Sequence, residues 1–333
     1  MFFLSSCGGY LEVTQANLQT AETTNSYIIE GNVSTIAGTL NSSGYLDGIG
    51  TNAKFNCAYG IVSDHRNGDL YVADTYNYVI RKINSAGVVT TVAGTVGVSG
   101  NVDANGLNAR LGDISEIVMD SVGNFFLADK TNYSIRMMTP TGTVSTFSAD
   151  PDLTNIYGID IDANDNLYAV MDIGNNQSKL LKFSPSGVKT IIRSDFPAAI
   201  KVKYDNLTGS IYVAGQNVIY KLDASYNRTI FAGGGTLTGG QNGFKSDVIF
   251  NWNWDMEIGQ DGSLYVMDAG NYILRRIDPD GEVTHIAGTY GVPGATDGMG
   301  LSASFNWVEG LTISKEGYIY MIDCGSKTVR MVR

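Results

Sequence analysis

The chain has 333 residues and a formal net charge of −11, with 22 Lys and Arg against 33 Asp and Glu. It contains no basic run that would release counterions from a phosphate backbone, so we expect no nucleic-acid ligand. No stretch is long and apolar enough to be predicted as a membrane-spanning helix. Forty Gly against six Pro, with Asn and Asp between apolar runs, indicate many tight turns.

The first segment, residues 1–31, is polar after a short apolar start, MFFLSSCGGYLEV. Leu4 to Gly8 resembles the lipobox of bacterial lipoproteins, in which the Cys is lipidated. The resemblance implies lipidation at Cys7 of a truncated signal, a flexible tether up to residue 31, and a lipid-anchored, extracytoplasmic protein of the cell envelope. The competing interpretation is a disordered start without an anchor. In the lipoprotein interpretation, the protein contacts the membrane only through the lipid on Cys7.

The stretch from Tyr59 to Gly94 contains four short alternating apolar runs separated by turn residues. Asn67-Gly68 is typical of a tight hairpin turn. The runs predict four antiparallel strands, which together make one small twisted sheet: 59–62, 70–73, 79–83 and 88–93.

This unit recurs six times. Its second predicted strand always holds an aromatic residue, at spacings of 55, 42, 44, 53 and 55 residues: Tyr71, Phe126, Tyr168, Tyr212, Tyr265 and Tyr320. A period of this length with four strands per unit predicts an all-β, six-bladed β-propeller of four-stranded antiparallel blades over residues 32–333.

The sixth unit ends with its third strand at the C-terminus, Arg330 to Arg333. An unpaired fourth-strand pattern lies at Val33 to Gly38 and matches Val89 to Gly94. We therefore expect the N-terminal strand to pair with the last blade, which closes the ring and removes free sheet edges.

The repeats also resemble those of the NHL-repeat propeller family, on the segments GDLYVADTYNYVIRKI (68–83), GNFFLADKTNYSIRMM (123–138), GSLYVMDAGNYILRRI (262–277) and GYIYMIDCGSKTVRMV (317–332). The resemblance implies the propeller fold and, with the lipobox, a Bacteroidetes-like envelope lipoprotein. It does not define a function, because the family includes binding modules, extracellular sensors and a few enzymes. Blades 3 and 4 depart from the pattern. Met171 and Gly215 replace the Asp, and Leu181 and Tyr220 replace the Arg.

Besides Cys7, two cysteines remain, and the repeat places Cys57 and Cys324 on the same face of adjacent blades. We favour two buried free thiols over a disulfide, because the repeat alone does not give the Cα separation that a bridge requires.

Four connections between blades are long and alike, and they lie on one face: 37–60, 93–115, 232–254 and 287–310. Asp47, Asp103 and Asp297 in these loops are followed by or lie close to Gly, but their spacing does not match an EF-hand calcium loop. We expect them to cap short helical turns instead. We expect the loop aromatics Phe55, Phe250 and Phe305 to pack internally.

Aligning the six units gives a ring of residues where the innermost strands begin, at the mouth of the central channel: Tyr59, Ser115, Tyr157, Ile200, Trp254 and Glu309. The next position gives Gly60, Glu116, Gly158, Lys201, Asp255 and Gly310, and neighbouring loops add Tyr76, Asn253 and Trp307. Aromatic rings beside amides and carboxylates are suited to stacking on a sugar while hydrogen-bonding its hydroxyls. We expect Trp254 and Tyr157 to face solvent. The alternative role of Lys201 is an ion pair with Asp255 or Glu116.

Neither of the two histidines is predicted near this mouth. His65 falls in a hairpin on the opposite face and His285 in an outer strand, so a histidine base or zinc ligand is not expected. Carboxylate chemistry stays open, because Glu309-Gly310 resembles the inner-strand Glu-Gly of six-bladed, calcium-dependent gluconolactonase-like enzymes.

The sequence therefore favours a non-catalytic, monomeric binding propeller without a cofactor, whose glycan or peptide ligand binds on the long-loop face. Its predicted ligand-binding residues are Tyr59, Glu116, Tyr157, Lys201, Asn253, Trp254, Asp255, Trp307 and Glu309. The alternative is a hydrolase or lactonase that depends on calcium or another divalent metal, with Glu116, Asp255 and Glu309 as metal ligands.

Overall fold

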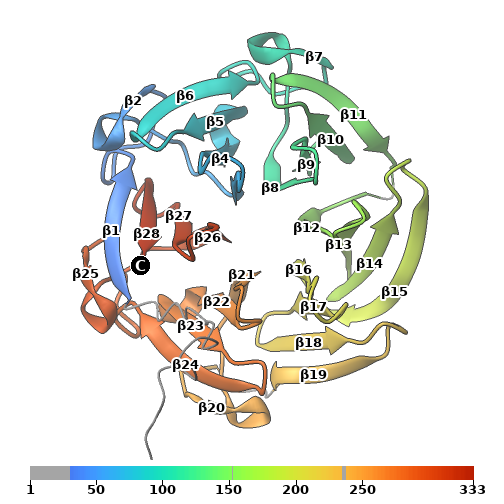
Figure 1. Cartoon of the computed structure of the whole chain (residues 1–333), viewed down its shortest axis with the longest axis vertical. Helices are drawn as coiled ribbons and strands as arrows, with labels where there is room; N and C mark the ends of the chain where they lie inside the picture. Colours follow the sequence, from blue (N-terminus) through green and yellow to red (C-terminus); the bar gives the residue numbers. More distant parts are fainter. Residues whose placement is uncertain (1–30, 152, 235–237) are drawn as a thin grey trace, which may run out of the picture.

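The computed structural model describes residues 31–151, 153–234 and 238–333. The predicted lipidation site Cys7 and the tether up to residue 30 lie outside the described residues. The described residues form six antiparallel sheets arranged as blades around a common axis (Figure 1). The predicted six-bladed all-β propeller is confirmed.

The first strand of each blade lies nearest the axis and the fourth lies outermost (Figure 1). Blade 1 consists of β3 Ile61–Ser63, β4 Leu70–Asp74, β5 Val79–Ile83 and β6 Val88–Ala93. Blade 2 consists of β8 Ile114–Met119, β9 Phe125–Asp129, β10 Ser134–Met138 and β11 Thr143–Ala149. Blade 3 consists of β12 Ile156–Ile161, β13 Leu167–Gly174, β14 Gln177–Phe183 and β15 Lys189–Pro197. Blade 4 consists of β16 Lys201–Tyr204, β17 Ile211–Ala214, β18 Val218–Leu222 and β19 Arg228–Gly233. Blade 5 consists of β21 Asn253–Ile258, β22 Leu264–Asp268, β23 Ile273–Ile277 and β24 Glu282–Ala287. Blade 6 consists of β26 Val308–Ile313, β27 Ile319–Asp323, β28 Thr328–Val332 and β1 Asn32–Ala37.

Four blades carry a fifth, two-residue strand that the sequence pattern does not predict. Each comes from a long connection and pairs with an outermost strand: β2 Gly48–Ile49, β7 Ala104–Asn105, β20 Gly243–Phe244 and β25 Gly298–Met299. A single 3₁₀ turn follows each of them: η2 Gly50–Asn52, η4 Gly106–Asn108, η5 Lys245–Asp247 and η7 Gly300–Ser302. Two further 3₁₀ turns join second and third strands, η3 Thr75–Asn77 and η6 Ala269–Asn271.

The N-terminal strand β1 closes the ring, as predicted. It pairs with β28 in an antiparallel register that sets Val33 opposite Val332 and Thr35 opposite Arg330. Figure 1 shows the blue β1 alongside the red β28. Because Val33 and Ala37 are buried, the closing strand contributes side chains to the core as well as backbone pairing.

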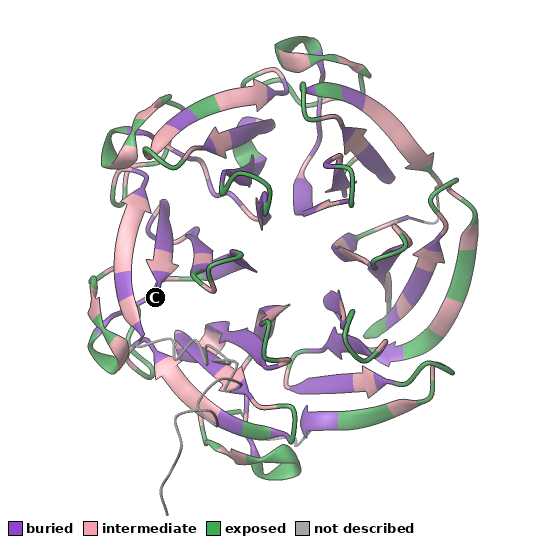
Figure 2. Cartoon of the chain, viewed as in Figure 1, coloured by how far each residue is buried: buried purple, intermediate pink, exposed green. Residues whose placement is uncertain are grey.

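The core lies between the blades. One cluster, for example, joins Val33 and Val332 of blade 6 to Tyr265 and Leu274 of blade 5. Figure 2 shows that the inner strands are largely buried and that exposed residues lie in the turns and on the outermost strands. Since each sheet is covered by its neighbours, no blade buries its apolar faces alone.

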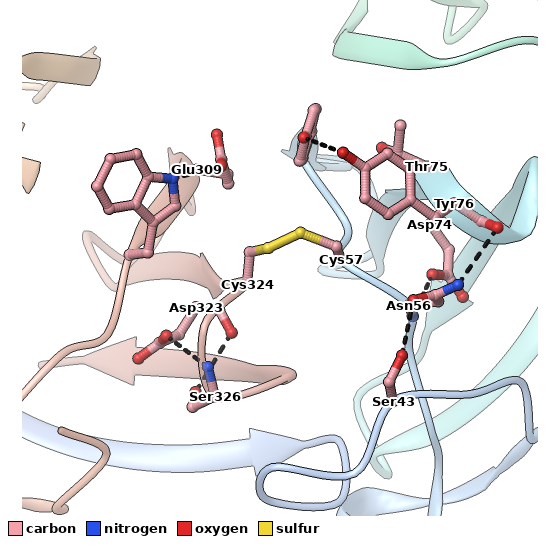
Figure 3. The surroundings of a disulfide bond; sticks show 12 residues. Ser43, Asn56, Cys57, Asp74, Thr75, Tyr76, Glu309, Asp323, Cys324 and Ser326 are labelled. Atoms are coloured by element: carbon pink, nitrogen blue, oxygen red, sulfur yellow. Dashed lines mark hydrogen bonds between the residues drawn. A yellow bond between two sulfur atoms is a disulfide. The ribbon is translucent and has the colours of Figure 1, made fainter.

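Cys57 and Cys324 form a disulfide, with their Cα atoms 4.6 Å apart and a sequence separation of 267. The preferred prediction of two free thiols is wrong. The bridge ties the loop before β3 to the turn after β27, so it links blade 1 to blade 6 beside Glu309 (Figure 3). The closing seam is therefore held by both a strand and a covalent bond.

The loop aspartates do not cap the short helical turns, so that prediction is also wrong. The residues at the caps of η2 and η7 are Ile49 and Met299, and neither makes a side-chain cap hydrogen bond. Asp47 instead accepts a hydrogen bond from Arg81 at 2.7 Å, and Asp297 accepts one from Arg330 at 2.7 Å.

These arginines are fully buried and connect each long loop to its blade. Arg81 also donates to Asp74 at the end of β4 and to the carbonyl of Lys54, and its guanidinium lies 5.1 Å from the Phe55 ring centroid. Arg136, Arg275 and Arg330 occupy the same position in blades 2, 5 and 6, where they bind Asp129, Asp268 and Asp323. The expected internal packing of Phe55, Phe250 and Phe305 is confirmed.

Among the described residues, no helix has the length and apolar character needed to cross a bilayer.

Candidate functional site

A cavity of about 210 Å³ lies where the innermost strands begin, on the face that carries the long loops. Its lining comes from all six blades and comprises Tyr59, Tyr76, Asp113, Ser115, Lys130, Tyr157, Ile200, Lys201, Trp254 and Glu309. All six residues of the ring aligned from the repeats are in this lining. The equivalent positions of the repeat therefore converge on one site.

Trp254 is the tryptophan that lines the cavity, and the chain's other two tryptophans lie against it at the rim. The rings of Trp252 and Trp254 are stacked almost parallel, at 5° with centroids 5.8 Å apart. The centroid of Trp307 lies 6.0 Å from that of Trp254, at an interplanar angle of 52°. Trp254 is half-buried and packs against the core of blades 5 and 6, which fixes the plane that it presents to the cavity.

Tyrosines form the remaining aromatic surface. The hydroxyls of Tyr59 and Tyr76 are 2.9 Å apart and hydrogen-bond each other. Burial and this hydrogen bond raise the pKa of Tyr59 well above its usual value, so its hydroxyl stays protonated. On the blade 2 and 3 side, the Lys130 ammonium lies 4.3 Å from the centroid of the Tyr157 ring. The cavity thus combines aromatic faces with hydroxyl and ammonium donors.

The Lys201 ammonium lies buried at the bottom of the site, between two carboxylates of other blades. It donates to Glu116 and lies 3.5 Å from Oδ1 of Asp255. Burial lowers the pKa of Lys201, but Asp255 and Glu116 outweigh that effect and the net pKa is raised, so the ammonium stays charged. The ion pair that the sequence left open is therefore present, and it is buried rather than solvated.

Glycines in the same ring allow the innermost strands to approach one another. A Cβ on Gly60 would lie 2.9 Å from the Glu116 Cα, and one on Gly158 would lie 2.9 Å from the Lys201 Cα. These distances are too short for any side chain. The ring therefore places a glycine against the backbone of Glu116 and another against that of Lys201, in the neighbouring blades.

Several predicted ligand-binding residues do not reach the cavity. Glu116 and Asp255 are buried in the ion pairs with Lys201, and Asn253 is 0% exposed. Asn253 and Asp255, which the sequence predicts as ligand-binding residues, therefore offer no accessible polar group beside Trp254. Alternating side chains on a strand point to opposite sides, so the neighbours of a residue that faces the cavity point away from it.

Trp307 lies outside the lining and is 37% exposed, while its Nε1 donates to Oε1 of Glu309 at 2.7 Å. Trp254 and Tyr157 are each partly exposed, in agreement with their predicted position. Asp113 and Lys130 line the cavity but are not among the residues predicted from the sequence. Asp113 occupies the loop position of Cys57, Trp252 and Trp307, and Lys130 directly follows the Asp that ends β9, so both could have been found by extending the repeat alignment into the loops.

In blades 1, 2, 5 and 6, the Asp at the end of the second strand holds the loop that leads into the site. Asp268 accepts the backbone N–H of Asn251 at 2.9 Å, and Asp323 accepts that of Asn306 at 3.0 Å. Each of these Asn residues immediately precedes a tryptophan of the site. The buried Arg–Asp pairs of the repeat therefore position Trp252 and Trp307.

The comparisons with known proteins agree with this architecture. No family model matches the chain. The chain is 23% identical over 301 residues to the chloroplast protein Suppressor of Quenching 1 of Arabidopsis thaliana, covering 89% of this chain and 26% of that protein. It is 30% identical over 107 residues to bovine NHL repeat-containing protein 2, covering 31% of this chain and 15% of that protein.

The chain is a six-bladed propeller with NHL repeat-containing homologues. The homology is partial, because this NHL-related propeller spans about a quarter of the length of the first relative and 15% of the second. The relationship predicted from the repeats is thereby confirmed at the level of the repeat and the fold.

Solved structures similar to the NHL-related propeller include several from Bacteroides. A protein of unknown function from Bacteroides thetaiotaomicron superposes with a TM-score of 0.76 at 21% identity, covering 90% of this chain and 75% of that one. An auxiliary nutrient binding protein of the same species gives 0.74 at 17%, covering 90% and 76%. A gluconolactonase from Xanthomonas campestris gives 0.61 at 8%, covering 84% and 86%. At these identities the likeness shows the fold.

The carboxylates of the site do not form a cluster of metal ligands. Over 31–151, 153–234 and 238–333, no three His, Cys, Asp or Glu side chains are grouped so that they could hold a metal ion. Of the three carboxylates considered as ligands, only Glu309 lines the cavity. The ammonium of Lys201 neutralises the carboxylates of Glu116 and Asp255.

Glu309 is the acid whose environment is most unusual in the cavity. Burial raises its pKa to about 7, although hydrogen bonds from Trp307 and Trp254 and the charge of Lys201 lower it. Glu309 therefore changes charge near neutral pH, and the carboxyl form can donate a hydrogen bond to a ligand.

This pKa predicts a pH dependence of folding. The folded state binds a proton at Glu309 more tightly than the unfolded state does, so the free energy of unfolding should fall as pH rises from about 4.5 to about 7. Glu309→Gln should remove this contribution and gain stability relative to the wild type at pH 8, on the order of 2 kcal/mol. Denaturant unfolding between pH 5 and pH 8 measures the difference. Glu316→Gln, at an exposed acid, is the control, and a Glu309→Gln variant that follows the wild-type slope would contradict the assignment.

Proposed function

We propose that this chain is a non-catalytic binding propeller of the cell envelope, and that it binds a glycan in the central cavity. The observation that supports this most directly is the position of Trp254 in the cavity lining with three tyrosines, together with the contact of the chain's other two tryptophans with Trp254. Outside this site the chain has no tryptophan. An aromatic concentration of this kind is typical of a binding surface rather than of a propeller core.

The polar groups of the cavity favour a sugar over an apolar ligand. Glu309, Asp113, Ser115 and Lys130 surround the aromatic faces, so donors and acceptors are available at the edge of a ring that stacks on Trp254. Sugars present apolar C–H faces and polar hydroxyl edges, which match this arrangement. A peptide is the other candidate ligand, and we prefer the glycan because the lining combines aromatic faces with polar side chains.

The envelope location is supported by two features of different kinds. The disulfide between Cys57 and Cys324 is typical of proteins in an oxidising compartment. Among the similar structures are auxiliary nutrient binding proteins from Bacteroides, and a nutrient-binding role at the envelope is what we propose for this chain by analogy. The predicted lipid anchor at Cys7 and a monomeric state belong to the same proposal.

The competing function is a divalent-metal-dependent hydrolase or lactonase. The arrangement supports it less well, because Glu309 is the single predicted metal ligand that faces the cavity and Lys201 neutralises the other two. Metal-dependent hydrolysis of a lactone panel, abolished by Glu309→Gln, would establish the enzyme instead.

Trp254→Ala tests the binding proposal. The purified protein is applied to glycan and peptide arrays, and the affinity for the strongest glycan is then measured by calorimetry. Removing a central aromatic anchor typically costs on the order of 2 kcal/mol, so Trp254→Ala should weaken binding at least about tenfold. Glu309→Gln should change binding much less at pH 6, where the Glu309 carboxyl is mostly protonated.

The control for Trp254→Ala is Tyr318→Ala, at an exposed aromatic residue in the hairpin between β26 and β27, at the opposite end of β26 from Glu309. It should bind like the wild type. Binding to peptides without binding to any glycan would reject the glycan, and an unchanged affinity of Trp254→Ala would reject the site.

A further inference from the structure

Two tryptophans next to the cavity are exposed and lie outside its lining. Trp252 is 40% exposed and Trp307 is 37% exposed. Both contact Trp254, the tryptophan of the cavity wall, with ring centroids 5.8 and 6.0 Å from its own. The aromatic surface of the site therefore continues from the cavity onto the rim.

The fold does not require tryptophan at these positions. Trp252 and Trp307 occupy the same loop position as Cys57, Asp113, Asn155 and Ala198. All of these residues except Asp113 have positive φ angles, between 41° and 64°. The left-handed backbone is thus a property of the loop and not of the residue in it. Since a side chain as small as that of Ala198 satisfies the loop, internal packing does not explain two exposed indoles.

Both indoles are held on well-anchored backbone. The carbonyl of Trp252 accepts the N–H of Ala269 at 2.9 Å, and that of Trp307 accepts the N–H of Cys324 at 3.2 Å. The Nε1 of Trp307 is already bound to Glu309, so the part of the ring left for a ligand is its apolar face. Rigid aromatic planes bind with little loss of conformational entropy.

The cavity is too small to enclose a ligand that also covers Trp252 and Trp307. At about 210 Å³ it lies below the range of pockets that enclose drug-sized molecules, which begins at roughly 300 Å³. It is suited to a single sugar ring. A longer glycan would have to continue over the rim, where Trp252 and Trp307 lie.

We propose that Trp252 and Trp307 form an outer subsite for the second and following sugars of a glycan chain whose terminal sugar occupies the cavity against Trp254. This inference rests on the proposed glycan-binding function and deepens it: the physiological ligand is the end of an oligosaccharide or polysaccharide, and not a free monosaccharide.

The experiment uses the strongest glycan from the array as a length series: its terminal monosaccharide, the disaccharide and the trisaccharide. Calorimetry measures affinity, and intrinsic fluorescence gives a second readout because all three tryptophans are in the site. The wild type should bind the trisaccharide at least about tenfold more tightly than the monosaccharide, the range expected for added aromatic stacking.

Trp252→Ala should lose most of this gain with length and keep the affinity for the monosaccharide. Trp254→Ala should weaken every member of the series. For Trp307 the matched pair is Trp307→Phe and Trp307→Ala: Phe retains an aromatic face but loses the hydrogen bond to Glu309. The outer subsite predicts that Phe keeps most of the gain with length and that Ala loses it.

Three outcomes would overturn the inference and leave the proposed function intact. They are equal affinity of the wild type for the monosaccharide and the trisaccharide, equal weakening of both by Trp252→Ala, and equal loss in Trp307→Phe and Trp307→Ala. The last would show that Trp307 acts by positioning Glu309. If no arrayed glycan binds the wild type, the proposed function itself is rejected.

Discussion

Arg275→Leu should destabilise the protein by roughly 3–5 kcal/mol, the usual cost of leaving a buried carboxylate without its partner. Arg275 is fully buried and donates to Asp268 at 3.1 Å. It also donates to the carbonyls of Ile249 and Gln241, at 2.8 and 2.6 Å, in the long loop that carries Trp252 and Trp254. The substitution leaves these acceptors without a donor and releases the loop, so ligand affinity should fall together with stability.

The adjacent residue provides the matched control. Arg276 lies on the same strand, is partly exposed, and forms ion pairs with Asp261 and Asp278. Surface pairs contribute little, so Arg276→Leu should cost about 1 kcal/mol or less. Chemical denaturation of both variants measures the contrast. Equal destabilisation by the two substitutions would show that the buried Arg275–Asp268 ion pair does not contribute more to the stability of the blade than a surface pair does.

Removal of the closing strand should have an even larger effect, because a chain that begins at Gly38 lacks β1 entirely. The outer edge of β28 would then be unpaired, and the contacts of Val33 and Ala37 with the core would be lost. An exposed edge strand promotes aggregation, so this variant should be largely insoluble, whereas a chain that begins at Gly31 should remain folded.

Soluble yield and thermal unfolding compare the two truncations. Should the shorter chain fail to yield any protein, Val33→Asp in the longer chain gives the second measurement, since it places a charge in the core at the same strand. If the chain that begins at Gly38 is as soluble and as stable as the one that begins at Gly31, ring closure by β1 is wrong.

Much of this architecture could be predicted from the sequence, because a propeller is built from a repeated local pattern. Period-two alternation and turn residues define the strands, and the aromatic position from Tyr71 to Tyr320 sets the period. The missing last strand and the matching pattern at Val33 give the closure. The same alignment found the six residues of the mouth, from Tyr59 to Glu309, since equivalent positions of a closed ring must face one another.

What the sequence could not provide depends on contacts between residues that are distant in the chain. The Cys57–Cys324 bridge spans 267 residues, and only the closed ring brings the two Cα atoms to 4.6 Å. The partners of Asp47 and Asp297 are buried arginines, whereas local capping rules pointed to the adjacent helical turns.

The burial of the charged side chains at the mouth also depends on contacts between residues that are distant in the chain. Glu116, Lys201 and Asp255 come from three blades, and the sequence shows their positions in the repeat but not the distance between their side chains. The sequence by itself determined the fold, the closure and the ring of residues at the mouth, because these follow from periodicity. The tertiary structure decided which of those residues line the cavity and which neutralise one another beneath it, because that depends on how far each side chain reaches across the closed ring.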